Sequence, residues 1–268
     1  MGFQLKSVFS KVNVEYFNTI KYDDCHIINV GLSNKLGFKP ASATLFLLPY
    51  YVDRVENFSV YAASRDYHLA VKEIGESILP MLAAEFTENH FEIFGDHSPI
   101  DERLAAASAG LGVLGDNGLL INEKYGSYVF IAEIISDVSP ELLGLEDNKE
   151  IGYCGHCGLC RCACPTAILA GDSGGCLSAI TQRKGELTAS EVEIMKSCNT
   201  VWGCDACQKV CPHNKDAKVT PIAFFQNDRI TSLTTEEIEA MSDAEFSKRA
   251  FSWRGKKTVL RNLKLLGY

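Results

Sequence analysis

The sequence lacks any apolar run near the roughly 20 residues that a membrane-spanning helix needs. Its longest apolar run, residues 43–51, has the length of a buried strand. The N-terminus shows neither the apolar core of a secretory signal nor a twin-arginine motif, so we expect a cytoplasmic protein and no membrane partner. An excess of positive charge is also missing. The net charge of −8 argues against non-specific nucleic-acid binding by the chain as a whole, because neutralising phosphates requires Lys and Arg.

Basic residues do gather near the C-terminus, where they form either a local basic patch or simply the solvated face of a helix. They are Arg249, Arg254, Lys256, Lys257, Arg261 and Lys264.

Cysteine is abundant, with eleven in 268 residues. The run Cys154-x2-Cys157-x2-Cys160-x3-Cys164-Pro165 has the spacing of a bacterial ferredoxin [4Fe–4S] motif, whose fourth cysteine normally ligates the other cluster of a pair. A second run, Cys204-x2-Cys207-x3-Cys211-Pro212, lacks only the first cysteine, which Cys176 can supply. We therefore predict two [4Fe–4S] clusters and a role in moving electrons. Under the crossing rule the ligands are Cys154, Cys157, Cys160 and Cys211 for cluster one, and Cys176, Cys204, Cys207 and Cys164 for cluster two.

Zinc sites and disulfides are the alternatives for these cysteines. Zinc sites do not require the Cys-x3-Cys-Pro ending, and disulfides need an oxidising compartment. The three remaining residues, Cys25, Cys162 and Cys198, are interpreted as small buried hydrophobic side chains.

The hydrophobic pattern predicts a mixed α/β domain over residues 1–148, a ferredoxin-like double-cluster module over 149–220, and a helical tail over 221–268 that packs back on the domain. Strands are expected at 25–31, 43–51 and 91–94. Two further strands, 118–122 and 127–135, are expected to form a hairpin about a turn at 123–126. Helices are expected at 68–85, 101–109, 188–197, 234–249 and 258–266, with an acidic linker at 139–150.

Several blocks of the chain resemble the epoxyqueuosine reductase family, cobalamin-dependent iron–sulfur enzymes of queuosine biosynthesis related to reductive dehalogenases. The resemblance rests on motifs spread over roughly residues 60–260, including the two cysteine runs. The other blocks are Arg65-Asp66-Tyr67-His68, Asp96 with Asp101-Glu102-Arg103 and Ala109-Gly110-Leu111-Gly112, Asn117, Tyr125-Gly126-Ser127-Tyr128, Ala132-Glu133, His213-Asn214-Lys215 and Ser252-Trp253-Arg254-Gly255-Lys256-Lys257.

The resemblance implies a cobalamin-binding α/β domain beside the clusters, an external low-potential electron donor of the ferredoxin or flavodoxin type, and the epoxide of a modified nucleoside in tRNA as substrate. It places the proton donor at Asp96. A carboxyl group can serve as a general acid if burial raises its pKa; the alternative is that Asp96 caps the helix that follows. Candidate cofactor-binding residues are Arg65, Tyr67, His68, Asn117, Tyr125 and Ser127.

Two departures separate the chain from the family pattern. The family's Gly-Lys-Asn is replaced by Gly115-Asp116-Asn117, which turns a cation into an anion. Many members also continue into a helical-repeat extension, whereas this sequence ends at Tyr268, so we expect a short form. In such a form, with a net charge of −8, tRNA binding either depends on the basic tail or is absent. The alternatives are a corrinoid reductase with another substrate, such as a small molecule or an organohalide, and a plain electron-transfer protein. The 150 or so residues before the clusters argue against plain electron transfer.

Overall fold

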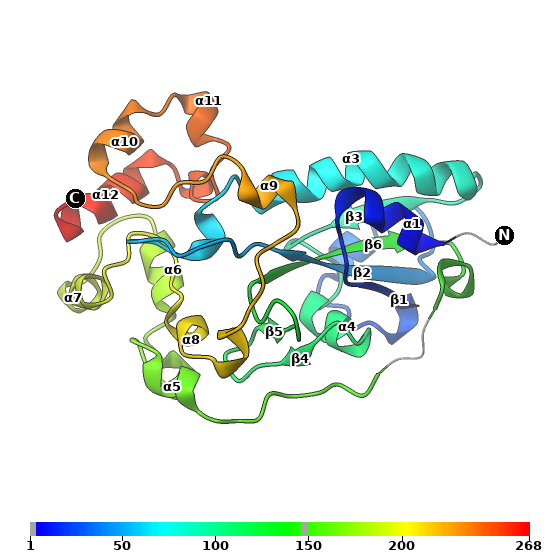
Figure 1. Cartoon of the computed structure of the whole chain (residues 1–268), viewed down its shortest axis with the longest axis horizontal. Helices are drawn as coiled ribbons and strands as arrows, with labels where there is room; N and C mark the ends of the chain where they lie inside the picture. Colours follow the sequence, from blue (N-terminus) through cyan, green and yellow to red (C-terminus); the bar gives the residue numbers. More distant parts are fainter. Residues whose placement is uncertain (1–3, 146–148) are drawn as a thin grey trace.

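A four-stranded antiparallel sheet, ordered β1-β2-β6-β3, lies at the centre of the first half of the chain (Figure 1). The computed structural model describes residues 4–145 and 149–268. The strands are β1 (Phe17–Lys21), β2 (Ser42–Pro49), β3 (Phe91–Phe94), β4 (Val113–Leu114), β5 (Leu120–Ile121) and β6 (Val129–Ser136). The helices are α1 (Leu5–Phe9), α2 (Val30–Ser33), α3 (Tyr67–Glu85), α4 (Glu102–Ser108), α5 (Leu159–Ala163), α6 (Leu177–Gln182), α7 (Ala189–Ser197), α8 (Ala206–Lys209), α9 (Ala223–Gln226), α10 (Thr235–Ala240), α11 (Asp243–Phe246) and α12 (Lys256–Leu266).

Both faces of the sheet are covered, so its two central strands are apolar on both sides. Successive side chains of a strand point to opposite faces. Phe46 and Leu48 of β2 pack with α1 and α3, whereas Leu45 and Leu47 pack with α4. Strand β6 alternates in the same way. Its Glu133 lies opposite Leu45 and Phe94, among apolar residues on the α4 side.

Capping residues fix the starts of the two covering helices. Asp66 accepts the His68 N–H at 3.0 Å at the start of α3. Asp101 accepts the Arg103 N–H at 3.1 Å and the Leu104 N–H at 3.3 Å at the start of α4. The helices predicted at 68–85 and 101–109 are confirmed. The suggestion that Asp96 caps the second helix is wrong, because Asp101 occupies that position.

The strand predicted at residues 25–31 is wrong. A short 3-10 helix, η2 (Tyr22–Asp24), ends there and α2 begins a few residues later. Asn29 caps α2 by accepting the Leu32 N–H at 3.0 Å, which diverts the chain from an extended path. Ile27 alone makes a bridge, to Ile100.

The predicted hairpin is also wrong, although both of its strands exist. β5 pairs with β4 rather than with β6. The Asn122 side chain accepts the N–H groups of Lys124 and Tyr125 and closes a tight local turn, so the chain leaves β5 before it enters the central sheet. The expected linker at 139–150 contains a 3-10 helix, η4 (Pro140–Leu143), which buries Leu143; residues 146–148 of that prediction lie outside the described residues.

The cysteine-rich segment contains α5 to α8, with the 3-10 helices η5 (Ile168–Ala170) and η6 (Pro212–Asn214). Two amide side chains fasten it to the end of the sheet. Gln208 Nε2 donates to the Ser127 carbonyl oxygen at 3.0 Å and to the Tyr50 hydroxyl at 3.1 Å. Asn214 accepts the Ser127 N–H at 2.7 Å and donates to Ser127 Oγ at 2.9 Å. We call Ser127, Gln208 and Asn214 the amide joint.

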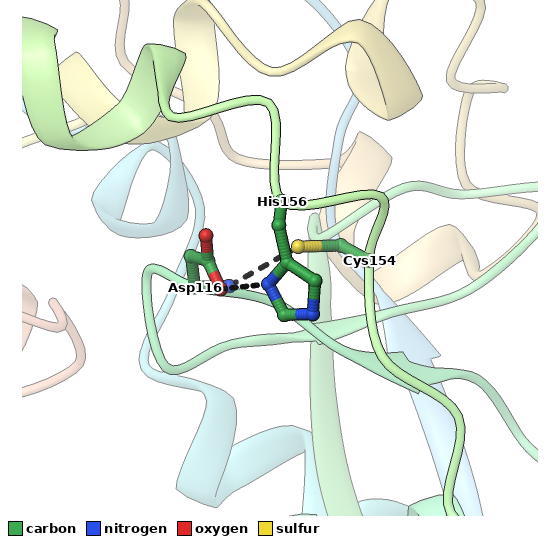
Figure 2. Close-up of side chains that lie close together, drawn as sticks. All are labelled: Asp116, Cys154 and His156. Carbon is green, nitrogen blue, oxygen red and sulfur yellow. Dashed lines mark hydrogen bonds and ion pairs between the residues drawn. The ribbon is translucent and has the colours of Figure 1, made fainter.

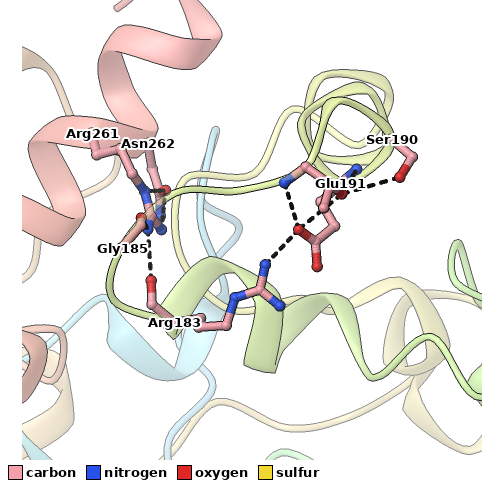
Figure 3. Close-up of polar contacts among 7 residues, drawn as sticks. Arg183, Gly185, Ser190, Glu191, Arg261 and Asn262 are labelled. Atoms are coloured by element: carbon pink, nitrogen blue, oxygen red, sulfur yellow. Dashed lines mark hydrogen bonds and ion pairs between the residues drawn. The ribbon is translucent and has the colours of Figure 1, made fainter.

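The C-terminal segment from α10 to α12 packs on residues 58–63 and on the fully buried Trp202. Buried Asn262 of α12 donates to the Thr181 and Val201 carbonyl oxygens, at 2.7 and 2.8 Å. Figure 3 shows Arg261 beside it, donating to the carbonyl oxygens of Arg183 and Gly185. The helix predicted at 258–266 is confirmed, the one at 188–197 corresponds to α7, and the one at 234–249 is divided into α10 and α11.

Most of the C-terminal basic side chains are engaged inside the molecule. Arg249 donates to Asp228, Arg254 stacks on the Trp253 ring at 3.7 Å, and Lys256 donates to the Met241 carbonyl oxygen. Lys257 and Lys264 are exposed. Within the described residues no helix is long and apolar enough to cross a membrane.

Replacing Gly126 by Ala should disrupt the amide joint. Gly126 has φ +58°, and a Cβ placed there would lie 2.1 Å from Asn214 Oδ1. Gly144 also has positive φ, at +78°, but none of the described residues has an atom within 4 Å of an added Cβ. Gly144→Ala should therefore cost only the left-handed backbone penalty of about 1–2 kcal/mol. Gly126→Ala should lower the urea unfolding midpoint of the reconstituted protein clearly more than Gly144→Ala does. Equal shifts for the two variants would contradict the importance of this contact.

Candidate functional site

Four cysteines surround one small cavity between the two cysteine runs. Cys154, Cys157, Cys160 and Cys211 line a space of about 90 Å³. These are the four predicted ligands of cluster one, and Cys211 comes from the second run, as the crossing rule requires. The Asp116 N–H donates to Cys154 Sγ at 3.4 Å. Four soft thiol donors around one space fit an iron–sulfur cluster, and a backbone donor to a ligand sulfur is one of the groups that set cluster potential.

The residue that departs from the family pattern lies at this cavity. Figure 2 shows the Asp116 carboxylate pointing at the His156 ring. Asp116 Oδ1 lies 2.7 Å from His156 Nδ1. Arg161 Nη2 is 3.7 Å from the other carboxylate oxygen. The Asp116 side chain is only 11% exposed, and its carboxylate is held between the His156 ring and the Arg161 guanidinium. In this chain, therefore, the position where the family has a Lys holds a carboxylate that contacts an imidazole and a guanidinium.

A larger cavity of about 640 Å³ lies between the sheet and the cysteine-rich segment. Cys176, Cys204 and Cys207, three predicted ligands of cluster two, form part of its wall. Burial raises the pKa of the Cys204 thiol to about 12 and that of Cys207 to about 11. Thiolates at these buried positions need a cationic partner, and the iron of a cluster supplies that charge.

The facing part of this cavity carries acidic and aromatic side chains. Tyr67, His68 and Asp96 line it together, and the Tyr67 ring stacks on Phe130 at 4.1 Å between ring centres. His68 Nε2 lies 4.0 Å from Asp96 Oδ2. A hydrogen bond to Asp66, 2.8 Å from His68 Nδ1, raises the pKa of His68. Burial, and then the charges of Asp96 and Glu102, raise the pKa of Tyr67.

Asp96 has an unusual backbone and an open side chain. Its φ is +66°, a region that non-glycine residues rarely adopt. Its side chain is 71% exposed into the cavity. The protein alone therefore does not bury this carboxyl group, and any burial of it requires a molecule in the cavity.

Glu102, which was not among the candidate residues, is held directly behind Asp96. Its Oε2 accepts the Asp96 N–H at 3.2 Å. Burial raises the pKa of Glu102 to about 7, with the charge of Asp96 acting in the same direction. A carboxyl group with this pKa is half protonated near neutral pH, which is the property wanted of a general acid.

Glu133, also absent from the candidates, is 0% exposed. Among the described residues neither of its carboxylate oxygens has a hydrogen-bond partner of normal geometry. Burial raises the pKa of Glu133 to about 8, and the Ser98 hydroxyl offsets only part of this effect. One feature of the sequence could have identified Glu133: it is a charged residue inside the otherwise apolar run of β6.

Four of the six candidate cofactor-binding residues line the larger cavity, namely Tyr67, His68, Asn117 and Ser127. The other two lie elsewhere. Arg65 stacks over Phe224 and pairs with Glu73 at 3.0 Å. The buried Tyr125 hydroxyl donates to Glu15 Oε2 at 2.6 Å.

The cysteines outside the two cavities differ in exposure. Cys164, the eighth predicted ligand, is among the lining residues of neither cavity; its sulfur is 3.7 Å from the Thr166 hydroxyl. Cys25 is buried as expected, Cys198 is half-buried, and the interpretation of Cys162 as buried is wrong because α5 presents it to solvent.

Comparison with known proteins supports the organisation seen here. Residues 153–214 match the model of the 4Fe-4S double cluster binding domain. The epoxyqueuosine reductase of Leadbetterella byssophila is 32% identical over 235 residues, covering 84% of this chain and 74% of that protein. The Cyclobacterium marinum enzyme is 35% identical over 212 residues, covering 78% of this chain and 65% of that protein. The chain belongs to the epoxyqueuosine reductase family.

Solved members of this family share the fold. The structure from Streptococcus thermophilus has a TM-score of 0.75 and 21% identity, with 98% of this chain and 79% of that one covered. The chain spans 60% of the Staphylococcus aureus relative and 67% of the Lactococcus garvieae relative. Family membership also confirms the mixed α/β class and the double-cluster segment that the cysteine spacing predicts.

Anaerobic reconstitution should give about eight irons and eight sulfides per chain, because two clusters of four irons each require eight thiolates. Cys176→Ala should damage the cluster beside the larger cavity and leave the other intact, whereas exposed Cys162→Ala should keep the full iron content. Iron and sulfide analysis with electron paramagnetic resonance provides the measurement. A plateau at four irons, or zinc in place of iron, would contradict the two-cluster assignment.

Glu133 should make stability depend on pH. Its carboxyl group stays protonated in the folded protein up to about pH 8 but ionises near its ordinary value of 4.5 when unfolded. The native state therefore binds more protons between these values, and the free energy of unfolding falls as the pH rises from about 5 to 8. Glu133→Gln should remove as much as ~4 kcal/mol of this fall, measured by denaturant titration. Glu92→Gln, at an exposed position on β3, should keep the wild-type slope; an unchanged slope in Glu133→Gln would show that the buried carboxyl group is ionised.

Proposed function

We propose that this protein is an oxidoreductase that removes the epoxide oxygen of epoxyqueuosine in tRNA. The overall change is epoxide plus two electrons plus two protons giving an alkene and water. The electrons come one at a time from an external low-potential donor protein of the ferredoxin or flavodoxin type. The observation that carries the proposal is the cavity of about 640 Å³, where predicted cluster ligands face a group of proton-bearing side chains.

Cobalamin is the proposed cofactor of this cavity. The cavity is within the size range of small-molecule sites, and the β6 residues Val129, Phe130 and Ile131 give it an apolar wall. The Asn117 side-chain amide lines the cavity, where it faces the Cys207 thiol and adds a polar group to the wall. These features fit a large, mostly apolar ring with polar edges. When bound, cobalamin supplies a strongly reduced cobalt nucleophile or radical. Tyr67, His68, Asn117 and Ser127 would hold it.

The remaining roles belong to the chain's own residues. Cluster one would receive electrons at the surface, where Cys157 is exposed, and cluster two would deliver them at the cavity wall. Asp96 would protonate the departing epoxide oxygen, with His68 beside it to hold the carboxylate. Bound cofactor and substrate would cover the Asp96 side chain, which is open to the cavity, and would exclude water from around it.

The tRNA substrate is proposed from the relatives. One solved family member has been determined with an epoxyqueuosine-modified tRNA stem loop. In this chain Trp253 lines the cavity, is 56% exposed and carries the Arg254 guanidinium over its ring. An aromatic–guanidinium pair of this kind stacks well on an unpaired base. Lys257 and Lys264 of α12 are exposed and would be available to the phosphates.

We also propose that the chain is divided by function. Residues 1–148 supply the apolar wall and the proton donors, and 149–220 supply the clusters. The tail, residues 221–268, closes the site, because Ala250 and Trp253 belong to the cavity lining.

Asp96→Asn should keep both clusters but lose turnover of epoxyqueuosine tRNA by about 10²–10⁴-fold, the usual contribution of a general acid. The amide keeps the shape of the side chain but delivers no acidic proton. The assay uses anaerobically reconstituted protein with cobalamin, excess reductant and modified tRNA. Asp243→Asn, at a fully exposed side chain of α11, serves as the matched control. Near-normal turnover by Asp96→Asn would reject the assignment. No turnover by the unmodified protein would favour a related reductase acting on another substrate.

A further inference from the structure

A groove of about 600 Å³ opens beside the thiols predicted to hold cluster one. Its wall includes Cys211 and Pro212, and both of these residues also line the small cavity of that cluster. The groove and the cluster cavity are therefore separated by little more than one ligand residue. A molecule seated in the groove would lie directly against a ligand of cluster one.

The groove is cationic, in contrast to the chain as a whole. Arg54, Lys209 and Lys215 line it, and its described lining residues include no carboxylate. All three cations are exposed, and none forms an ion pair or a side-chain hydrogen bond among the described residues. The neighbouring acids Asp53 and Asp216 do not belong to the lining. In a chain with a net charge of −8, three such cations around one groove favour an anionic partner.

Exposed apolar side chains lie around the same cluster. Val210 lines the groove and is exposed. Leu159, on α5 beside α8, and Tyr153, next to the first cysteine of the motif, are exposed as well. Apolar side chains with a charged rim are the usual composition of a protein–protein interface. The surface therefore fits an acidic protein better than a small anion.

The groove and the larger cavity lie on opposite sides of the amide joint. Tyr50 lines the larger cavity, whereas the next residue, Tyr51, lines the groove. Gln208 and Lys209 divide between the two spaces in the same way. The proposed nucleoside would occupy the larger cavity, so the groove faces away from it. Its position against cluster one favours an electron carrier over tRNA as the occupant.

We propose that this groove is the docking site of an acidic one-electron carrier protein, which Arg54, Lys209 and Lys215 hold against cluster one. The inference rests on the proposed function, which requires an external low-potential donor. In each encounter the carrier is oxidised by one electron and cluster one is reduced by one, and no bond forms or breaks. Two encounters supply the two electrons of one epoxide reduction. Electron-transfer contacts are small and transient, and attraction between opposite charges raises their encounter rate.

Cross-linking to an acidic bacterial flavodoxin locates the site without any turnover. A carbodiimide joins a Lys amine to a carboxylate only where the two touch, so Lys209 and Lys215 of the reconstituted protein should be linked to flavodoxin. Lys35 is exposed after α2 and lines none of these cavities, and it should remain unlinked. Peptide mass spectrometry identifies the linked residues. Cross-links confined to lysines outside the groove would overturn the proposal.

Stopped-flow reduction of the clusters by reduced flavodoxin, without tRNA or cobalamin, measures the contribution of each charge. Lys209→Glu and Lys215→Glu should each lower the second-order rate constant by about 10-fold at low ionic strength. The difference should disappear near 1 M salt, where charges are screened beyond about 3 Å. Lys35→Glu makes the same change in net charge and should keep the wild-type rate. Lys209→Gln should fall between wild type and Lys209→Glu.

Reduced methyl viologen controls for damage to the clusters. This small cationic reductant needs no docking surface, so it should reduce every variant at least as fast as the wild type. Equal flavodoxin rates in all variants would overturn the docking site. The same rates combined with weaker binding of a tRNA stem loop would assign the groove to nucleic acid, and this result would also overturn the proposal.

The outcome for the docking site is independent of the outcome for the proposed function. If flavodoxin reduces the clusters with the predicted charge dependence but no epoxyqueuosine tRNA is turned over, the docking site stands and the proposed function is overturned. If the epoxide is reduced with methyl viologen as donor while flavodoxin rates ignore the groove charges, the proposed function stands and the docking site is overturned.

Discussion

The amide joint is the constraint on which the site depends. Ser127 precedes β6, so hydrogen bonds from Gln208 and Asn214 attach the second cysteine run to the end of the central sheet. Each such bond contributes only about 1 kcal/mol net, but an unsatisfied buried amide would cost more. Gln208 directly follows Cys207, and Asn214 lies three residues after Cys211. The joint therefore sets where ligands of both predicted clusters lie relative to the sheet.

The larger cavity combines two kinds of chemistry because two different elements form its walls. The cysteine-rich segment contributes buried thiols whose thiolates need positive iron. The opposite wall includes Glu102, at the start of α4, whose carboxyl group has its pKa raised to about 7 by burial. Electrons and protons would thus arrive from opposite sides of one apolar space. Separation of this kind is what a net reduction requires, and neither segment alone provides it.

The correct predictions from the sequence concern those parts of the molecule whose residues follow a strict spacing rule. The cysteine runs, the long helix α3 and the central strands β2 and β6 follow such rules, and all are present. The hairpin failed because the Asn122 side chain satisfies two backbone N–H groups locally, which periodicity does not show. Glu102 and Glu133 were not among the candidate residues for a different reason: what distinguishes them is the burial of their carboxyl groups, which depends on how α4 lies across the sheet. Most of the basic side chains named in the tail are engaged within the molecule, whereas charge counting treats every Lys and Arg as exposed.

The most direct test of this account is electron paramagnetic resonance of the reduced, reconstituted protein with and without cobalamin. If cobalamin occupies the cavity walled by Cys176, Cys204 and Cys207, the signal of one reduced cluster should be broadened or split by paramagnetic cobalt, while that of the other changes much less. Cys176→Ala should abolish the perturbed signal and leave the second one. Two cluster signals that stay identical when bound cobalamin is present would contradict the account, because electrons could not then pass from the cavity wall to the cofactor.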